Sequence, residues 1–227
     1  MHGTFATKSI QIEPAILYLG TPVVLIGTCN EDGSYNLAPM SSAWWLGWRC
    51  MLGLARSSKT TENLIRTGEC VLNLPSADLV GAVDRLARTT GSDPVPPDKV
   101  KRGYRHEKDK FGLCGLAALA ADTISAPRAL ECPVQMEAKL AQIHELAQED
   151  DLRRGKSAAF EVRVIRVHAH PQIMMEHEPN RIDPDKWRPL IMSFQQFYGL
   201  TPEKLQRSEL GRIPESMYKP PGWRPAV

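Results

Sequence analysis

Three short apolar segments follow one another between residues 23 and 55, and only a few residues separate each from the next. Val23–Cys29 is rich in β-branched residues, which favour strands, and Cys50–Ala55 is a second apolar run. Between them, the turn signal Asn30–Gly33 is followed by the extended segment Tyr35–Trp48, which Pro39 interrupts. Three strands joined by tight turns predict an antiparallel meander or the wall of a β-barrel.

The pattern changes after residue 59, where apolar residues recur at helical spacing. A helix is predicted over Thr60–Thr67, with Thr60 or Thr61 as its N-cap and Gly68 as its stop. Beyond it the sequence predicts a strand at Cys70–Leu74, a helix at Asp78–Arg88 and a loop at Thr89–Lys101.

Two later strands each change the face on which their apolar residues lie. In the first, Val134–Leu140 alternates cleanly, but Ile143 is out of phase. In the second, Phe160–Val164 alternates and Ile165–Ala169 continues on the opposite phase. A slip of one residue indicates a β-bulge, which bends a sheet toward a barrel. The predicted fold class is therefore mainly β, a β-barrel with flanking helices.

Size and composition fit one folded domain. The chain has 227 residues, is 42% hydrophobic and carries a net charge of +2, which excludes a disordered chain and gives no basic excess for nucleic acid. We predict a single domain over residues 1–227, with a barrel core at about 15–170 and a C-terminal extension at about 171–227. The extension is expected to cover the barrel or a partner subunit with its large aromatic residues, which are Trp187, Phe194, Phe197, Tyr198 and Trp223.

The N-terminal sequence and the cysteines indicate a cytoplasmic protein. Residues 1–8 lack the basic and apolar regions of a signal peptide, and no apolar run approaches the roughly 20 residues of a membrane-spanning helix. The five cysteines form no CxxC pair and are predicted to be reduced, mostly buried thiols, with a catalytic or electron-relaying Cys114 or Cys132 as the alternative. His168 and His170 share a strand face without an evident third ligand, so no metal site is predicted.

Residues 56–63, Arg-Ser-Ser-Lys-Thr-Thr-Glu-Asn, link a predicted strand to the start of the predicted helix. A helix N-terminus presents free backbone N–H groups and the positive end of the helix dipole, so it suits an anion. Two cationic side chains and four hydroxyl groups accompany it here, a combination that matches a phosphate monoester. The alternative is an ordinary polar loop with a threonine cap.

Residues 36–43 form an extended, small and polar segment within otherwise apolar strands, and two tryptophans follow it. Small side chains would let a planar ligand lie against the backbone, with Asn36, Ser41 and Ser42 bonded to its ring edge. The alternative is a structural Ser-Ser pair within a strand.

Motifs along most of the chain share their order and spacing with one known family. The first set comprises Pro22–Leu25, Asp32-Gly33, Asn36–Ser41, Ser58–Asn63, Thr67–Glu69 and Val71–Pro75. The second set comprises Asp109–Phe111, Gly115-Leu116, Glu131–Val134, Glu137 and Pro189–Ile191, ahead of Tyr198. Together they resemble the flavin reductase-like family, whose fold is the FMN-binding split barrel.

The resemblance implies a homodimer that binds FMN at or near the subunit interface. The residues that would line the isoalloxazine ring are Asn36, Ala38, Pro39, Ser41 and Ser42. Those that would hold the phosphate are Arg56, Ser57, Ser58, Lys59, Thr60, Thr61 and Asn63. Lys110 matches a family lysine near the flavin, where a cation would stabilise the N1/O2 region of the reduced ring. A solvated surface lysine is the alternative.

The same resemblance implies a flavin reductase in which NADH or NADPH passes a hydride to the flavin, with no catalytic side chain of its own. The sequence has no G-x-G-x-x-G motif, so no Rossmann domain holds the dinucleotide, and His106 is a candidate contact for nicotinamide. A monooxygenase or another electron acceptor would be the partner, and neither nucleic acid nor a membrane is expected. Two alternatives stay open: an electron carrier with tightly bound FMN, similar to flavoredoxin, and a non-catalytic cofactor-binding protein on the same fold.

Overall fold

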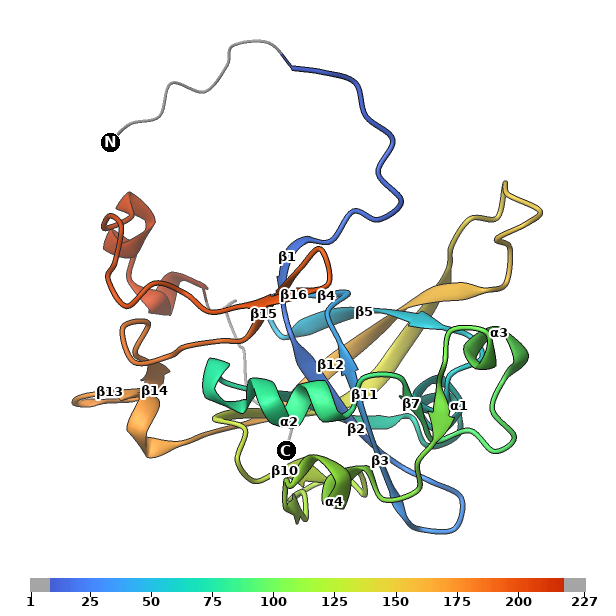
Figure 1. The fold of residues 1–227 in the computed structure, drawn as a ribbon. Coiled ribbons are helices and arrows are strands. Elements are labelled where there is room, and N and C mark those ends of the chain that lie inside the picture. The colour runs from blue at the N-terminus through green and yellow to red at the C-terminus, as the bar shows by residue number, and fades with distance from the viewer. Residues whose placement is uncertain (1–8, 219–227) are drawn as a thin grey trace.

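The computed structural model describes residues 9–218 and is built around one antiparallel sheet of seven strands (Figure 1). In their order of pairing, the strands are β3 (Tyr35–Met40), β2 (Val24–Cys29), β6 (Glu69–Leu74), β11 (Val134–Glu145), β12 (Ser157–Ala169), β5 (Arg49–Ala55) and β4 (Ala43–Leu46).

The two edge strands of this sheet, β3 and β4, are consecutive in the sequence. Residues 41 and 42 join them, so their ends lie at most about 11 Å apart. Seven strands laid flat would span about 29 Å. The sheet must therefore curl until its edges meet, and the predicted mainly β barrel with flanking helices is confirmed.

Shorter strands form small sheets around the barrel. They are β1 (Leu19–Pro22), β15 (Ile191–Ser193) and β16 (Gln196–Tyr198) in one sheet, and the pairs β7 (Thr89–Thr90) with β8 (Arg105–His106), β9 (Ala118–Leu119) with β10 (Arg128–Ala129), and β13 (Met174–Met175) with β14 (Glu178–Ile182). The β7–β8 pair is parallel, and it brings the two ends of the 89–106 segment together.

The α-helices are short. They are α1 (Lys59–Thr67), α2 (Val80–Arg85), α3 (Pro97–Val100) and α4 (Lys110–Cys114). Single 3₁₀ turns lie at η1 (Ala77–Leu79), η2 (Pro171–Ile173), η3 (Glu209–Arg212) and η4 (Glu215–Tyr218). Within residues 9–218, no helix has the length and apolar character needed to span a membrane.

Helix α1 follows its prediction except at its N-cap. Ser58 is the cap: its backbone is extended, and its Oγ accepts a hydrogen bond from the backbone N–H of Thr61 at 3.1 Å. The predicted caps Thr60 and Thr61 were wrong, because both already lie in the buried first turn. Gly68 ends the helix with a φ of 69°, as predicted.

Both predicted β-bulges are present in the pairing of β11 with β12. The register slips between Glu137 and Ala138, where Ile165 is the extra residue on the opposite strand. It slips again between Leu140 and Gln142 on β11. These are the positions at which the apolar pattern changes face in the sequence.

Two apolar cores share the central strands. On β2, Val24 and Ile26 point into the barrel, where they pack with residues such as Phe160. The alternate residues Val23 and Leu25 point outward, toward α2 and α4. Strand β2 is therefore buried on both faces, which explains its continuous apolar run.

The C-terminal extension returns to the barrel. Its Trp187 packs against the inner core and its Phe197 against the outer core. Phe194 and Tyr198 are 45% and 55% exposed, and Trp223 lies outside the described residues.

Glu137 is a fully buried carboxylate that ties residues 122 and 123 to the barrel. It accepts hydrogen bonds from the backbone N–H groups of Asp122 and Thr123, both at 2.8 Å, and from the hydroxyl of Thr123. Nε2 of His168 lies 2.7 Å away. Burial raises the pKa of Glu137, but these hydrogen bonds outweigh burial and lower the pKa to about 2.

We predict that Glu137 makes the fold sensitive to acid. Its pKa is lower in the folded chain than in the unfolded chain, so its stabilisation is present above about pH 5 and lost as the pH falls toward 2. The difference from the model-peptide value corresponds to about 3 kcal/mol. In urea unfolding between pH 6 and pH 2, the wild-type chain should lose about 3 kcal/mol more than Glu137→Gln. The exposed-carboxylate control Glu178→Gln should follow the wild type, and equal losses in Glu137→Gln and wild type would contradict the prediction.

Candidate functional site

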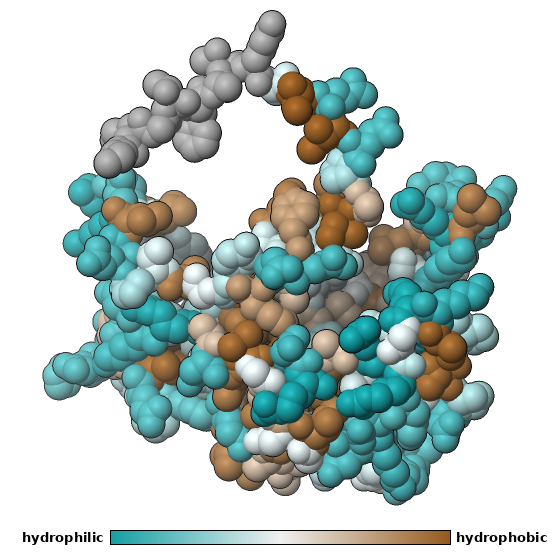
Figure 2. Space-filling model, viewed as in Figure 1, coloured by the Kyte–Doolittle hydropathy of each residue, from teal (hydrophilic) through white to brown (hydrophobic). Residues whose placement is uncertain are grey.

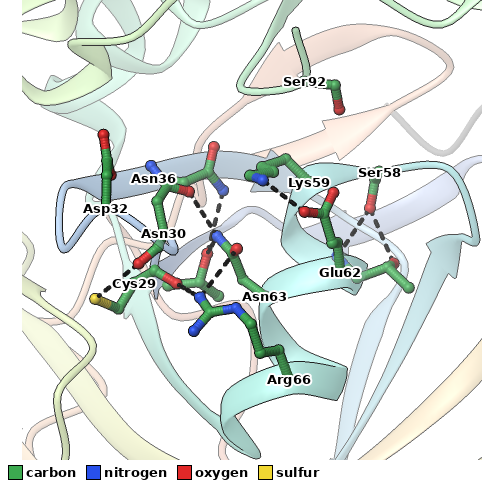
Figure 3. Close-up of polar contacts among 12 residues, drawn as sticks. Cys29, Asn30, Asp32, Asn36, Ser58, Lys59, Glu62, Asn63, Arg66 and Ser92 are labelled. Carbon is green, nitrogen blue, oxygen red and sulfur yellow. Dashed lines mark hydrogen bonds and ion pairs between the residues drawn. The ribbon is translucent and has the colours of Figure 1, made fainter.

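Side-chain amides close one end of the barrel between β2, β3 and α1 (Figure 3). Nδ2 of Asn36 donates to the hydroxyls of Thr28 and Thr60, each at 3.2 Å. Nδ2 of Asn63 donates to the same hydroxyl of Thr28 at 3.1 Å and to Oδ1 of Asn30 at 2.7 Å. This network fixes the first turns of α1 against the β2–β3 hairpin.

One atom of this network has no partner. Asn36 is 2% exposed, and its Oδ1 accepts no hydrogen bond from the described part of the chain. A Cβ on Gly91 would lie 2.8 Å from this oxygen and 3.1 Å from Cγ of Lys59, so only glycine leaves the space open. A buried acceptor without a donor costs free energy, and a bound N–H or O–H group would remove that cost.

A polar cleft of about 320 Å³ opens beside Asn36. Its volume is in the range of small-molecule sites. The β2–β3 hairpin, the start of α1 and the two loops joined by the β7–β8 pair line this cleft. Its lining residues are Asn30, Glu31, Asp32, Ser34, Asn36, Lys59, Gly91, Asp93, His106, Glu107 and Lys108.

The two cations predicted to hold a phosphate are each paired with a carboxylate. Nζ of Lys59 lies 2.6 Å from Oε1 of Glu62 (Figure 3). Arg56 forms an ion pair with Glu145, and its guanidinium lies 5.9 Å from the centre of the Phe160 ring. An anion at the start of α1 would therefore compete with these two carboxylates.

Most hydroxyls of the same segment are also engaged. Ser58 donates to Oγ1 of Thr61 at 2.9 Å, and Thr61 donates to the carbonyl that ends β5 at 2.8 Å. Thr60 accepts from the amide network. In the described part of the chain, the hydroxyl of Ser57 and the backbone N–H groups of Lys59 and Thr60 have no partner. These three groups are free donors at the N-terminus of α1.

Lys110 is buried, which excludes the alternative of a solvated surface lysine. It is the first residue of α4, a helix that packs beside β3, and it is 3% exposed. Its ammonium finds no hydrogen-bond acceptor among residues 9–218. Burial and the nearby charge of Lys99 lower the pKa of Lys110 to about 8, against an opposing effect of Glu107. A buried cation without a bonded counterion is suited to a ligand that brings negative charge.

The segment predicted to line a planar ring lies along β3 and the two residues after it. Ala38, Pro39 and Ser41 are half-buried, and Ser42 is exposed. Six residues of extended chain span about 20 Å, so Asn36 and Ser42 lie at opposite ends of the segment. Their side chains would therefore contact different parts of a bound molecule. That these residues bind a cofactor stays a prediction.

Several residues of the cleft were not predicted as site residues. Gly91 and Asp93 lie in the loop predicted after Thr89, and the two-residue strand β7 that brings this loop to the cleft carries no periodic signal. The nicotinamide candidate His106 does line the cleft, where its Nδ1 lies 3.2 Å from the carbonyl oxygen of Ser92. In the sequence, this part of the site is marked only by the polar loop that follows Thr89 and Thr90, both of which are buried in the structure.

Two further groups of residues carry atoms that can react or bind a metal. All five cysteines are unpaired, and burial raises the pKa of both Cys114 and Cys132, which opposes a reactive thiolate. Asp122, Glu137 and His168 each place one potential metal ligand atom within 4.8 Å of the others. Hydrogen bonds engage Glu137, and Asp122 forms ion pairs with arginines, so this group acts as a structural tie.

Comparison with known proteins identifies the family. The profile described as "Flavin reductase like domain" matches residues 17–201, so the chain belongs to the flavin reductase-like family, a family of flavin-binding oxidoreductases. The chain is 39% identical over 201 residues to the uncharacterized protein YdfE of Bacillus subtilis (strain 168), which covers 88% of this chain and 94% of that protein.

Two solved structures show the same fold. Flavoredoxin of Desulfovibrio vulgaris (Miyazaki F) superposes with a TM-score of 0.70 at 18% identity, over 91% of this chain and 100% of that one. Nitrilotriacetate monooxygenase component B from Bacillus cereus gives a TM-score of 0.69 at 19% identity, over 89% and 100%. The predicted split-barrel fold is therefore confirmed.

We predict that removing the buried charge of Lys110 stabilises the chain. The pKa of Lys110 is lower in the folded than in the unfolded chain, so its ammonium destabilises the fold at pH 7 by about 3 kcal/mol, and stability rises with pH between about 8 and 10.5. Urea unfolding of Lys110→Met should show a free energy of unfolding higher by up to about 3 kcal/mol at pH 7, with a smaller gain at pH 9.5. The exposed control Lys108→Met should match the wild type. A Lys110→Met chain less stable than wild type at pH 7 would overturn the prediction.

Proposed function

We propose that the chain is an FMN-binding flavin reductase that transfers a hydride from NADH or NADPH to flavin. The observation that carries this proposal is the unpartnered Oδ1 of Asn36, buried at a cleft beside the free N–H groups of α1. A flavin offers the complementary groups: a ring N–H for a buried acceptor and a phosphate for a helix N-terminus. The buried ammonium of Lys110 suits the negative charge that a reduced flavin carries at N1 and O2.

A phosphate monoester, as in FMN, fits the start of α1 better than an internal diester. Its three terminal oxygens can accept from the backbone N–H groups of Lys59 and Thr60 and from the hydroxyl of Ser57. The side chain of Thr60 is already engaged, because its hydroxyl accepts from the amide network. In this assignment the side chains of Thr60, Thr61 and Asn63 hold the helix in place, and the backbone binds the anion.

When bound, a flavin would supply the hydride-accepting chemistry, so that no acid or base from the chain would be needed. The chain positions and polarises the ring. Asn36 would accept from the ring edge, Gly91 would leave Oδ1 of Asn36 free of a neighbouring Cβ, and Lys110 would hold positive charge close to the ring. His106 also lines the cleft and is the proposed contact for the nicotinamide.

We further propose a cytoplasmic homodimer that passes reduced flavin, or its electrons, to a monooxygenase or another acceptor. Five unpaired thiols support a reducing compartment. The molecular surface supports a second copy, through the exposed apolar residues of its N-terminal segment and of β4.

The reductase assignment predicts that NADH or NADPH bleaches the bound flavin. The holo-protein is mixed anaerobically with each dinucleotide in a stopped-flow instrument, and the visible flavin absorbance is followed. Loss of absorbance with either donor within the time of turnover is the expected result. Flavin that is retained through gel filtration but bleaches with neither donor would replace the reductase by an electron carrier. A colourless protein whose added FMN shows no spectral change would replace it by a binding protein for another ligand.

A second prediction concerns the space at Gly91. Its backbone is outside the left-handed region, so Gly91→Ala adds only a methyl group, which would collide with Oδ1 of Asn36. The FMN dissociation constant, measured by fluorescence titration, should rise at least tenfold, which corresponds to about 1.4 kcal/mol. The matched control is Gly211→Ala, where no atom lies within 4 Å of the added carbon. Equal FMN affinity in the two variants would remove the cleft from the flavin site.

A further inference from the structure

Residues 9–17 form an arm that leaves the barrel before β1. In Figure 1 the arm arches away from the body of the molecule. None of its residues forms a hydrogen bond or ion pair with another described residue. Ile10 and Ile12 are 82% and 68% exposed and alternate with polar residues, so the arm has one apolar side with nothing packed on it.

An apolar surface lies at the base of this arm. We call it the β1–β4 face and define it by Tyr18, Leu19, Trp44, Leu46 and Phe194. These residues lie on adjoining elements, because the N–H of Phe194 donates to the carbonyl of Tyr18 at 2.7 Å and β1 contacts β4. Leu19, Trp44 and Leu46 are 74%, 58% and 75% exposed. Figure 2 shows hydrophobic residues gathered over this region, below the arm.

The total exposed area is larger than a compact monomer of this mass has. The chain exposes 14,753 Å². A compact 25.3 kDa protein exposes about 10,300 Å². Assigning the 17 residues outside the described range a fully unfolded area accounts for about 2,700 Å² of the difference. About 1,700 Å² is left, and the exposed arm and the exposed residues 199–218 both contribute to it. A stable interface needs about 800 Å² from each partner.

We propose that two copies of the chain exchange their arms, so that residues 9–17 of each copy lie on the β1–β4 face of the other. The arm and the face belong to one chain but do not meet within it, and a twofold axis brings both arms onto both faces in one closed arrangement. The net charge of +2 opposes such a pairing only weakly.

The exchange also reaches the flavin segment. Trp44 follows the exposed Ser42 by two residues, so the β1–β4 face begins where the predicted ring-lining residues end. The partner's arm would therefore border the open side of that segment. The inference rests on the proposed homodimer, to which it assigns the interface.

The decisive experiment places the photocrosslinker p-benzoylphenylalanine at position 12 of the full chain. Unlabelled and ¹⁵N-labelled copies are mixed, equilibrated, irradiated and digested for mass spectrometry. Arm exchange predicts crosslinks to peptides containing residues 18–19 or 44–46, about half of which join a light to a heavy peptide. Crosslinks that join only peptides of the same label place the arm on its own chain and overturn the proposal.

Variants test the same contact by sedimentation equilibrium. Trp44→Ser with Leu46→Ser should raise the dimer dissociation constant at least 100-fold, and Ile10→Ser with Ile12→Ser at least tenfold. The control Leu152→Ser, at a residue 78% exposed on the β11–β12 hairpin loop, should leave it unchanged. If the Trp44 and Leu46 double variant does not fold, the dissociation constant of the Ile10 and Ile12 variant and the crosslinks test the arm exchange.

The outcomes separate the two proposals. A wild-type chain that is monomeric at 50 µM overturns both the homodimer and the arm exchange. A wild-type dimer that the arm and face variants leave intact overturns the arm exchange alone. Flavin bleaching by NADH or NADPH is measured in a separate experiment. Its outcome tests the reductase activity and does not depend on the dimer or on the arm exchange.

Discussion

The two-residue connection between β3 and β4 is the constraint on which the rest of the structure depends. It joins opposite edges of a seven-stranded sheet, so the sheet can form only as a closed curve. The bulges on β11 and β12 relieve the bending this requires. Helix α1 follows β5 directly and packs against β2, β3 and β6. The amide network of Asn36 and Asn63 joins this helix to the β2–β3 hairpin.

Most of the fold could be predicted from the local pattern of apolar, polar and glycine residues. The alternation of Val134–Leu140, the phase change at Ile165 and the stop at Gly68 each reflect a backbone geometry that the side chains report directly. The helix cap was misassigned because serine and threonine at four neighbouring positions can all cap, and only the extended backbone of Ser58 decides between them. The β7–β8 pairing left no pattern, since a two-residue parallel contact depends on the fold around it.

The candidate site was harder to predict for a related reason. Residue type located Lys110 and the start of α1, but it did not show that Lys110 is buried without a counterion. Nor did it show which of the polar groups in residues 56–63 are already satisfied. Thr61 bonds within its own chain, whereas the backbone N–H of Lys59 is free. Such distinctions depend on three-dimensional partners, including Gly91, which lies 55 residues beyond Asn36 and brings no Cβ against its buried Oδ1.

If the start of α1 binds a phosphate, as proposed, the ion pairs of Arg56 with Glu145 and of Lys59 with Glu62 would set the affinity that a ligand must exceed to bind there. A small free anion gains only the contacts at the start of α1, and part of that gain is offset by the carboxylates it displaces. A larger molecule that also fills the cleft would gain further contacts. The free energy of these contacts would outweigh the cost of displacing the two carboxylates. The paired carboxylates would thereby disfavour simple anions of the surrounding solution and leave the anchoring groups in place for a ligand that engages both ends of the proposed site.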